Sequence, residues 1–289
     1  MKPAPFEYAA PQSVDEATAL LSEHGDDAKV LAGGQSLVPL LGLRLARPAV
    51  LVDVNRVAGL GGISRENGTL RVGAATRHAS IEHEPSIAAD LPLLAMAAPL
   101  IGHFQIRNRG TLGGSLAHAD PAAEWPAVAV ALDAELEIAR AGQTRRVPAR
   151  DFFLSTFVTA LEAEDLLVAV RFPVWGPGSG FAVEELARRS GDFAVAGAVC
   201  AVQLDGELIR RAAVALLGMS DTPVRATDVE RQLTGNAVDS LDLERLGREA
   251  VAPLEPPDDI HATGTYRKRI GSALVSRALA RATKEAHRG

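Results

Sequence analysis

The sequence has very little cysteine, with Cys200 the single example in 289 residues. One thiol excludes a disulfide framework within the chain, and it excludes a cysteine-ligated zinc or iron–sulfur centre built from this chain alone. Cys200 lies in the apolar run AVAGAVCAVQL, which is typical of a buried strand, so we predict a core cysteine rather than a nucleophile. No metal site is expected, because no pair among His78, His103 and His118 has the spacing of ligands on one helix face.

Positive charge is also scarce, since 30 Lys and Arg are outnumbered by 36 Asp and Glu and the formal net charge is -6. This balance argues against nucleic acid as the main partner. Basic residues do gather near the C-terminus, where their helical spacing predicts the solvated face of a terminal helix. These residues are Arg267, Lys268, Arg269, Arg277, Arg281 and Lys284.

Long apolar runs are missing as well. No run approaches the roughly 20 residues that a membrane-spanning helix needs, so no membrane insertion is expected. The opening MKPAPFEYAAPQ lacks the basic segment and apolar core of a signal peptide, and we expect a cytoplasmic location. Neither the spaced GxGxxG pattern nor GxxxxGK[ST] occurs, which disfavours a Rossmann enzyme and a P-loop nucleotide triphosphatase. No Ser–His–Asp arrangement indicates hydrolysis.

Two glycine pairs stand out among the residues that are present, in AGGQS at 32–36 and in TLGGS at 111–115. A glycine pair is usually kept where the backbone must adopt a conformation, or allow an approach, that a Cβ would block. Successive amides in such loops form concave nests that hold anionic oxygens, and the hydroxyls of Ser36, Thr111 and Ser115 are further donors. The pattern predicts one phosphate-bearing ligand gripped from two sides. The alternative is a pair of ordinary turns.

The first part of the chain alternates helical and strand patterns, starting in the order helix, strand, loop, helix and strand. A capping box at Ser13 and Glu16 predicts a helix up to residue 24. Strands are expected at 28–32, 50–54 and from residue 69, with helical patterns at 36–48, near His78 and at 91–102. A helix is predicted over 121–133, with Pro121 near its first turn. The segments 135–139 and 144–148 resemble paired strands, and 166–174 a further strand.

The cluster WGPGSG at 175–180 is the clearest break in the chain, and it predicts two domains, 1–176 and 177–289. Two long strand patterns follow, at 193–204 and 208–219, joined through Asp205-Gly206, a strong hairpin signal. Helical patterns at 226–235, 242–251 and 266–286 complete the chain. The second domain is therefore expected to be an antiparallel sheet covered by helices.

Three segments together carry a specific resemblance: AGGQSLVPLL, QIRNRGTLGGSLAHADPAAEWP and RRSGDFAVAG. They are similar to the FAD-binding medium subunit of molybdenum hydroxylases of the carbon monoxide dehydrogenase and xanthine dehydrogenase type, and the resemblance covers essentially the whole chain. It implies a PCMH-type FAD-binding domain of the vanillyl-alcohol-oxidase class, made of two α+β subdomains. It also implies a C-terminal domain with a three-stranded antiparallel sheet and helices.

The resemblance also implies which residues bind FAD. The first loop would line the diphosphate and the second would oppose it; the residues are Ala32, Gly33, Gly34, Gln35, Ser36 and Leu37, then Thr111, Leu112, Gly113, Gly114 and Ser115. Asp120 and Glu124 would contact the ribityl and flavin part, although a preference of carboxylates for a helix N-terminus is an alternative. Phe193 would shield one face of the flavin, with core packing beside Val195 as the alternative, and Arg189 would hold the flavin edge.

The implied function is electron transfer with non-covalent FAD. Molybdopterin would lie on a large partner subunit and two [2Fe-2S] clusters on a small one, in a dimer of heterotrimers, with an external electron acceptor. Two alternatives remain open: a free-standing FAD-dependent oxidoreductase of the same fold, which would need its own acid or base beside the ring, and a non-catalytic nucleotide-binding or assembly protein.

Overall fold

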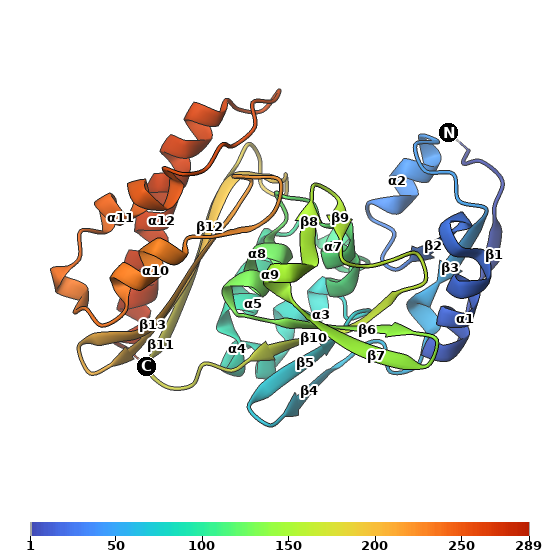
Figure 1. Cartoon of the computed structure of the whole chain (residues 1–289), viewed down its shortest axis with the longest axis horizontal. Helices are drawn as coiled ribbons and strands as arrows, with labels where there is room; N and C mark the ends of the chain where they lie inside the picture. Colours follow the sequence, from blue (N-terminus) through green and yellow to red (C-terminus); the bar gives the residue numbers. More distant parts are fainter. Residues whose placement is uncertain (1, 289) are drawn as a thin grey trace.

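The computed structural model describes residues 2–288 as three consecutive parts (Figure 1). A small N-terminal α/β unit leads into a central unit with a five-stranded sheet, and a third sheet backed by helices follows. α12, the longest described helix, is too charged to qualify as a membrane span, and no other described helix qualifies.

The N-terminal unit contains three parallel strands in the order β1-β3-β2. The capping box forms as predicted, because the Ser13 hydroxyl accepts from the Glu16 amide at 3.1 Å. Strand β1 was not predicted. Because β2 and β3 are parallel, their carboxyl ends lie at one edge of the sheet. The elements are β1 (Glu7–Ala9), α1 (Val14–His24), the 3-10 helix η1 (Gly25–Asp27), β2 (Ala28–Leu31), α2 (Leu37–Gly42), β3 (Val50–Asp53) and η2 (Val54–Arg56).

The central unit is built on an antiparallel sheet in the order β4-β5-β10-β6-β7. Its strands are β4 (Ile63–Glu66), β5 (Thr69–Gly73), β6 (Glu135–Arg140), β7 (Gln143–Pro148) and β10 (Leu166–Pro173), and β8 (Phe153–Ser155) pairs separately with β9 (Val158–Thr159). Its helices are α3 (His78–His83), α4 (Pro85–Asp90), α5 (Pro92–Ala97), η3 (Ala98–Leu100), α6 (Phe104–Arg107), α7 (Leu112–His118), α8 (Glu124–Ala131) and α9 (Ala149–Phe152).

The start of α8 differs from the sequence prediction. The helix begins at Glu124, so Pro121 lies before it rather than in its first turn. The cause is a turn at Asp120, whose carboxylate accepts from the Ala122 amide at 2.9 Å and whose carbonyl accepts from Ala123 at 3.0 Å. Asp120 therefore uses one carboxylate oxygen to shape this turn.

The C-terminal unit is an antiparallel sheet in the order β11-β12-β13-β14. The expected three strands are the long ones, and the two-residue β14 adds a short fourth. The Asp205-Gly206 turn joins β12 and β13 as predicted, with Gly206 at a φ of 61°. The elements are β11 (Ser179–Ala187), β12 (Ala194–Asp205), β13 (Leu208–Leu217), β14 (Val224–Arg225), α10 (Thr227–Leu233), η4 (Val238–Ser240), α11 (Leu243–Val251) and α12 (Gly264–Ala286).

The C-terminal sheet is buried on both faces, which explains its continuous apolar runs. Along β12, Val199 and Ala201 pack into the core that the two earlier units share, whereas Ala198, Cys200 and Val202 pack against α10–α12. Successive residues of a strand point to opposite faces, so alternate positions serve different cores. Cys200 is fully buried, which confirms the prediction of a core cysteine.

The prediction for the basic residues near the C-terminus is wrong for Arg267. Arg267 is only 4% exposed. Its guanidinium donates to the Val195 and Gly218 carbonyls and to the Asp259 carboxylate. It therefore ties α12 to the ends of β12 and β13. Arg269, Arg277, Arg281 and Lys284 are exposed, as predicted.

The Gly/Pro cluster forms the connection between β10 and β11. The division of the chain into two domains after residue 176 stays a prediction. Ionic contacts join the units on either side of it. Asp133, in the turn after α8, accepts from Arg211 on β13 and Arg225 on β14. The Arg211 guanidinium also lies 3.9 Å from the centre of the Trp175 ring.

Candidate functional site

The structure brings the two glycine loops together at the carboxyl edge of the N-terminal sheet. The first loop follows β2, and the second forms the first turn of α7. A Cβ at Gly33 would lie 2.4 Å from the carbonyl oxygen of Arg109, and a Cβ at Gly114 would lie 3.5 Å from the Cβ of Ala32. Gly33 is therefore required for close contact between the loops.

The first loop has a run of open amides. The N–H groups of residues 33–37 donate to no acceptor within the described part of the chain. Gly34 has a φ of 74°, a conformation that side-chain-bearing residues seldom adopt. Gln35 is held by its own side chain, which donates to the Gly33 carbonyl at 3.1 Å. Consecutive unpaired amides of this kind are suited to anionic oxygens.

The second loop differs, and the prediction that it forms a second nest of open amides is wrong. The amides of residues 112–115 all have acceptors, at distances of 2.8–3.1 Å. Two of them donate to the carbonyls of Ala74 and Thr76 at the end of β5, and two donate to Thr111, which caps α7. The loop is thus docked on the central sheet, and Leu112 and Gly113 are buried. Of the predicted hydroxyls here, that of Ser115 has no partner within residues 2–288.

Asn55 and Arg77, which the sequence reasoning missed, hold the two loops in register. The Asn55 amide donates to the Ala32 carbonyl at 2.8 Å and its oxygen accepts from Arg77 at 2.6 Å. Arg77 also donates to the Arg109 carbonyl. One available signal was position, because Asn55 closely follows a buried strand parallel to the one that ends at the first loop.

Asp53 and Tyr8 orient this bridge. The Asp53 carboxylate accepts from the Asn55 backbone at 2.9 Å and from the Tyr8 hydroxyl at 2.5 Å. Burial by itself raises the pKa of Asp53, but hydrogen bonds from Tyr8 and Asn55 more than offset it, and the pKa lies below its usual value. The carboxylate therefore stays ionised and fixes the rotamer of Asn55.

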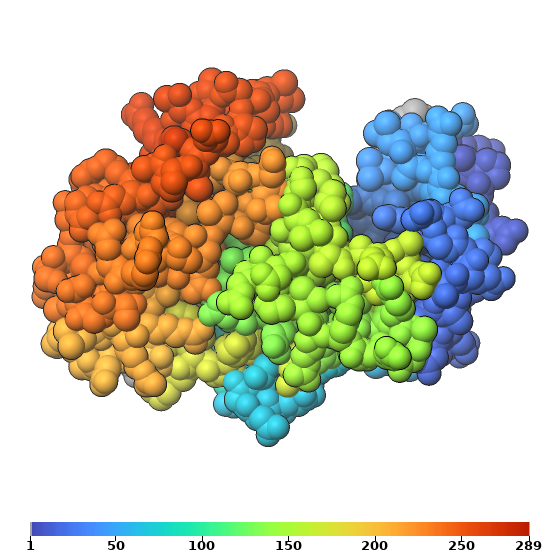
Figure 2. Space-filling model, viewed as in Figure 1, coloured from blue at the N-terminus to red at the C-terminus, as the bar shows by residue number. Residues whose placement is uncertain are grey.

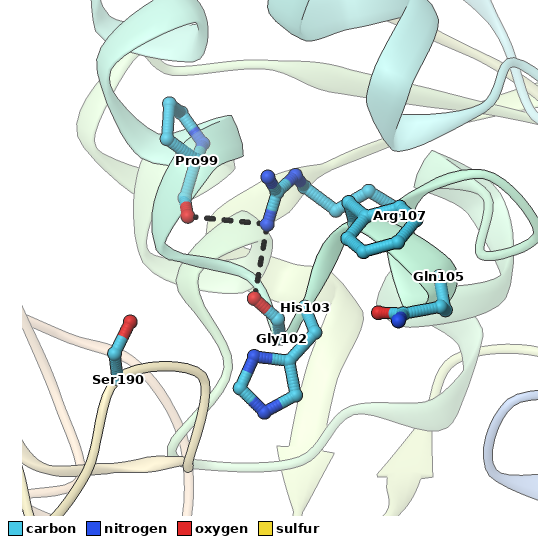
Figure 3. A pocket seen from close by; sticks show the side chains of 7 residues that line it. Pro99, Gly102, His103, Gln105, Arg107 and Ser190 are labelled. Atoms are coloured by element: carbon cyan, nitrogen blue, oxygen red, sulfur yellow. Dashed lines mark hydrogen bonds between the residues drawn. The ribbon is translucent and has the colours of Figure 1, made fainter.

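Of the two arginines that flank the second loop in sequence, one is committed elsewhere. Arg107 binds Glu82 at 2.7 Å. It also donates to the carbonyls of Pro99 and Gly102, and Figure 3 shows these two bonds. Arg109 has an exposed side chain and lies close enough to Arg77 to lower the pKa of that guanidinium, after the larger effect of burial. Arg77 and Arg109 therefore supply the positive charge beside the loops.

His78 supports the second loop from behind. Its ring accepts from the indole N–H of Trp125 at 2.9 Å, and its backbone amide donates to the Gly110 carbonyl at 3.1 Å. Burial, followed by the charges of Arg77 and Arg107, lowers the pKa of His78 to about 4. The ring is therefore neutral at physiological pH, and its position behind the loop indicates a packing role.

A hollow of about 370 Å³ lies between the central and C-terminal units (Figure 3). Ser190 lines one wall, and the other wall is formed by Pro99, Gly102, His103, Phe104, Gln105 and Arg107. Gln105 and Arg107 of this wall belong to the segment QIRNRG quoted above, whereas the sequence assigned no role to Pro99, Gly102 or Phe104. The walls nearly touch, because a Cβ at Gly191 would lie 2.6 Å from the His103 ring.

The loop that carries Ser190 also carries the predicted flavin residues. Arg189 is exposed, and Phe193 is 61% exposed, so the alternative that Phe193 packs in the core is wrong. An exposed aromatic ring beside a hollow is available to cover a planar ligand.

Glu124 stands at the N-terminus of α8 and is buried, and its neighbour across the domain boundary is Glu185 on β11. His118, at the end of α7, has its ring 4.9 Å from that of Phe157. Within residues 2–288, no three His, Cys, Asp or Glu side chains are grouped so as to hold a metal ion.

The residues fit a dinucleotide such as FAD. The open amides at 33–37 and the two arginines suit a diphosphate. The exposed ring of Phe193, on the loop that carries Ser190, could cover a planar group. The close approach at Gly33 leaves no room for a side chain between the loops.

Comparisons with known proteins agree with this geometry. Residues 4–175 match the family described as FAD binding domain in molybdopterin dehydrogenase, and residues 181–282 match the CO dehydrogenase flavoprotein C-terminal domain. The 6-hydroxypseudooxynicotine dehydrogenase complex subunit alpha of Paenarthrobacter nicotinovorans is 43% identical over 99% of this chain and 97% of the relative. The caffeine dehydrogenase subunit beta of Pseudomonas sp. (strain CBB1) is 40% identical over 98% and 96%.

Solved structures give the same result. Carbon monoxide dehydrogenase from Hydrogenophaga pseudoflava superposes with a TM-score of 0.96 at 40% identity, covering 99% of each chain. Quinoline 2-oxidoreductase from Pseudomonas putida 86 gives 0.93 at 36% identity, again with 99% coverage of each. The predicted fold is confirmed. The chain therefore belongs to the family of FAD-binding subunits of molybdenum-containing dehydrogenases.

Proposed function

We propose that this chain is the electron-transfer subunit of a three-subunit molybdenum hydroxylase. In this proposal it receives electrons from [2Fe-2S] clusters of a small partner subunit and passes them through FAD to an external acceptor. A large partner subunit carries molybdopterin and binds the substrate that is to be oxidised. Two such heterotrimers form the assembly. The family of the chain and its similarity to carbon monoxide dehydrogenase subunits support the proposal.

The observation that carries the proposal is the open amide run at 33–37, held against the second loop by Asn55 and Arg77. When bound, FAD supplies the acceptance and release of electrons. The chain's own residues bind and orient it: amides 33–37 hold the diphosphate, and Arg77 and Arg109 add positive charge. Phe193 covers one face of the ring and excludes water, and Arg189 contacts the ring edge.

The chain cannot supply the clusters itself. Its one cysteine is fully buried in β12, and burial raises the pKa of the thiol well above its usual value, so a thiolate ligand is not available. The clusters must therefore come from another subunit. The predicted transfer needs a positioned flavin and no acid or base on this chain.

Exposed apolar side chains support the proposal that this chain is part of a complex. Six of them, each at least half exposed, occur on two segments that face each other across a hollow in the surface (Figure 2): Val38, Leu43, Leu45, Leu154, Phe157 and Val158. Such clustering is more typical of surfaces that become buried in an assembly than of an isolated monomer.

The relatives' names mention carbon monoxide, caffeine and 6-hydroxypseudooxynicotine, three chemically unlike compounds. Relatives that are each 39–43% identical to this chain thus have names that point to very different substrates. We infer that substrate choice lies outside this subunit, and we expect its exchange between such complexes to preserve substrate preference.

The direct test is to purify the chain and measure bound flavin. We expect a yellow protein that releases about one FAD per chain on denaturation and rebinds it. Co-expression with the neighbouring subunits should give a complex in which substrate reduces the flavin, whereas the isolated chain should not turn over substrate. A colourless protein that cannot be reconstituted would overturn the FAD assignment. Steady substrate turnover by the isolated chain would instead favour a free-standing flavoenzyme.

A further inference from the structure

Two carboxyl groups from different units lie near enough at the interface for the charge of Glu185 to act on Glu124. Glu124 is buried, whereas Glu185 is half-buried with its Oε2 atom enclosed. Glu124 is the first residue of α8, and Glu185 lies near the end of β11. On β11, Phe181 and Val183 pack into the core shared with the earlier units, while Ala182 packs into the other core. Strand alternation therefore turns Glu185 toward the same side as Phe181 and Val183, which is the side of α8.

Neither carboxyl has a cationic partner. No side chain in the described part of the chain donates a hydrogen bond to Glu124 or Glu185, and the buried Oε2 of Glu185 has no hydrogen-bond partner at all. The adjacent Glu184 shows the contrast, because it faces α12 and pairs with Arg281. A buried ionised carboxylate without such a partner is strongly disfavoured.

No nearby positive charge compensates the two carboxyl groups in the described part of the chain. Asp120, in the turn before α8, adds further negative charge. The helix α5, which packs on β11, carries no charged side chain, and Glu285 of α12 is engaged with the Phe181 amide on the other side of the strand. Arg225, on β14, is committed to Glu230 and Asp133. The interface is therefore acidic and without a counter-ion.

The titration of the two groups agrees with this geometry. Burial, and then the charges of Glu185 and Asp120, raise the pKa of Glu124 to about 8. Burial raises the pKa of Glu185 to about 7. Because the two groups interact, they titrate as one unit, which has lost one proton but not both near neutral pH.

We propose that the carboxyls of Glu124 and Glu185 form an acid pair across the domain interface that holds a proton at neutral pH and couples FAD binding to that proton. One carboxyl of the pair stays neutral, because the charge of Glu185 acts on the buried Glu124 and both groups cannot ionise at low cost. The coupling rests on the proposed function. FAD carries a negative diphosphate, and its ring would further exclude water from Glu124. Both effects favour the protonated pair, so binding should draw a proton from solution.

The first experiment uses the apo-protein and does not depend on FAD. Infrared spectra across pH 5–10 should show a protonated carboxylic acid carbonyl band that persists at pH 7 and disappears above pH 8. In Glu185→Gln the band should titrate at lower pH, because the neighbouring charge is gone. Glu184→Gln is the matched control and should keep the wild-type curve. Full ionisation of both carboxyls below pH 6 in the wild type would overturn the pair.

The second experiment measures FAD affinity by flavin fluorescence between pH 6 and pH 9. For a one-unit rise of the pair's pKa from about 8 on binding, wild-type affinity should fall about fivefold over this range. We expect less than about a threefold fall in Glu185→Gln and the wild-type fall in Glu184→Gln. A flat wild-type profile, with the infrared band present, would overturn the coupling and leave the proposed function standing. If the wild type binds no FAD at all, the proposed function fails, and the apo titration still decides the pair.

Discussion

The two glycine loops have similar sequences but differ in the hydrogen bonding of their backbone amides. In AGGQS the amides of 33–37 are open, and the glycines permit loop contact and a positive φ. In TLGGS the amides are already paired, and Gly113 is required because a Cβ would lie 2.5 Å from that of Ala74. A glycine pair therefore marks close approach, and the partners of the neighbouring amides decide whether it can bind an anion. We therefore propose the first loop as the binding element, with the second as the wall on which it rests.

The largest expected effect comes from putting a negative charge into the first loop. Ser36→Asp should weaken FAD binding about a thousandfold, or ~4 kcal/mol, because its carboxylate would lie beside the diphosphate in a partly desolvated site. Ser36→Asn has a similar size without charge and should lose far less. Fluorescence titration of both variants checks this. Equal loss in the two variants would show that bulk, not charge, matters at this loop.

The second prediction concerns the stability of the protein at low pH, which depends on His78 behind the second loop. The folded-state pKa of His78 is depressed to about 4 from an ordinary value of 6.5. The unfolded state therefore binds more protons between these values, so stability is fully present above pH 6.5 and is lost as the pH falls toward 4. The loss is on the order of 3 kcal/mol for a shift of this size. Urea unfolding against pH should show a shallower acid slope in His78→Asn than in the wild type. A surface change, His24→Asn, should leave the slope unchanged.

The third test separates packing from ligand binding. Gly113→Ala should lower the free energy of unfolding by ~2 kcal/mol, because the added methyl meets the Ala74 backbone. Gly42→Ala is the control, since nothing lies within 4 Å of its added Cβ, and it should gain up to about 1 kcal/mol from helix propensity. If the two substitutions have equal effects in urea unfolding, the second loop is not the packed wall described above.

The smallest expected effect concerns the bridge between the loops. Asn55→Ala removes its hydrogen bonds to Ala32 and Arg77 and should reduce FAD affinity about tenfold. The exposed Asn108, next to the second loop, provides a matched control in Asn108→Ala. Calorimetric titration should find the loss only in the first variant. Unchanged affinity in Asn55→Ala would mean that the loops keep their register without this bridge.

Local signals predicted much of the fold. The capping box at Ser13, the hairpin at Asp205-Gly206 and the apolar strand around Cys200 each depend on neighbouring residues, and each forms. Pro121 misled because Asp120 makes a competing turn whose hydrogen bonds delay the helix. Strand β1 was missed because its three residues, Glu7–Ala9, are too short to show a period.

The site was predictable in its position and not in its chemistry. The contact of Gly33 with Arg109, the bridge through Asn55 and the burial of Arg267 all join residues distant in sequence, so no local pattern carries them. Which amides are open depends on whether a loop docks on a sheet, and that is settled by β5 and the Ala74 and Thr76 carbonyls. The resemblance to a family pointed to both loops, and it did not distinguish their roles.

The double-sided sheet limits how the chain can be divided. Because β12 sends Val199 into one core and Cys200 into the other, a fragment beginning at residue 177 would present a bare, strand-rich apolar wall to water. Such an exposed apolar face promotes the association of copies by hydrophobic contact. Expressed alone, the C-terminal unit should precipitate unless the first 176 residues are supplied in trans, so the two parts must mature together.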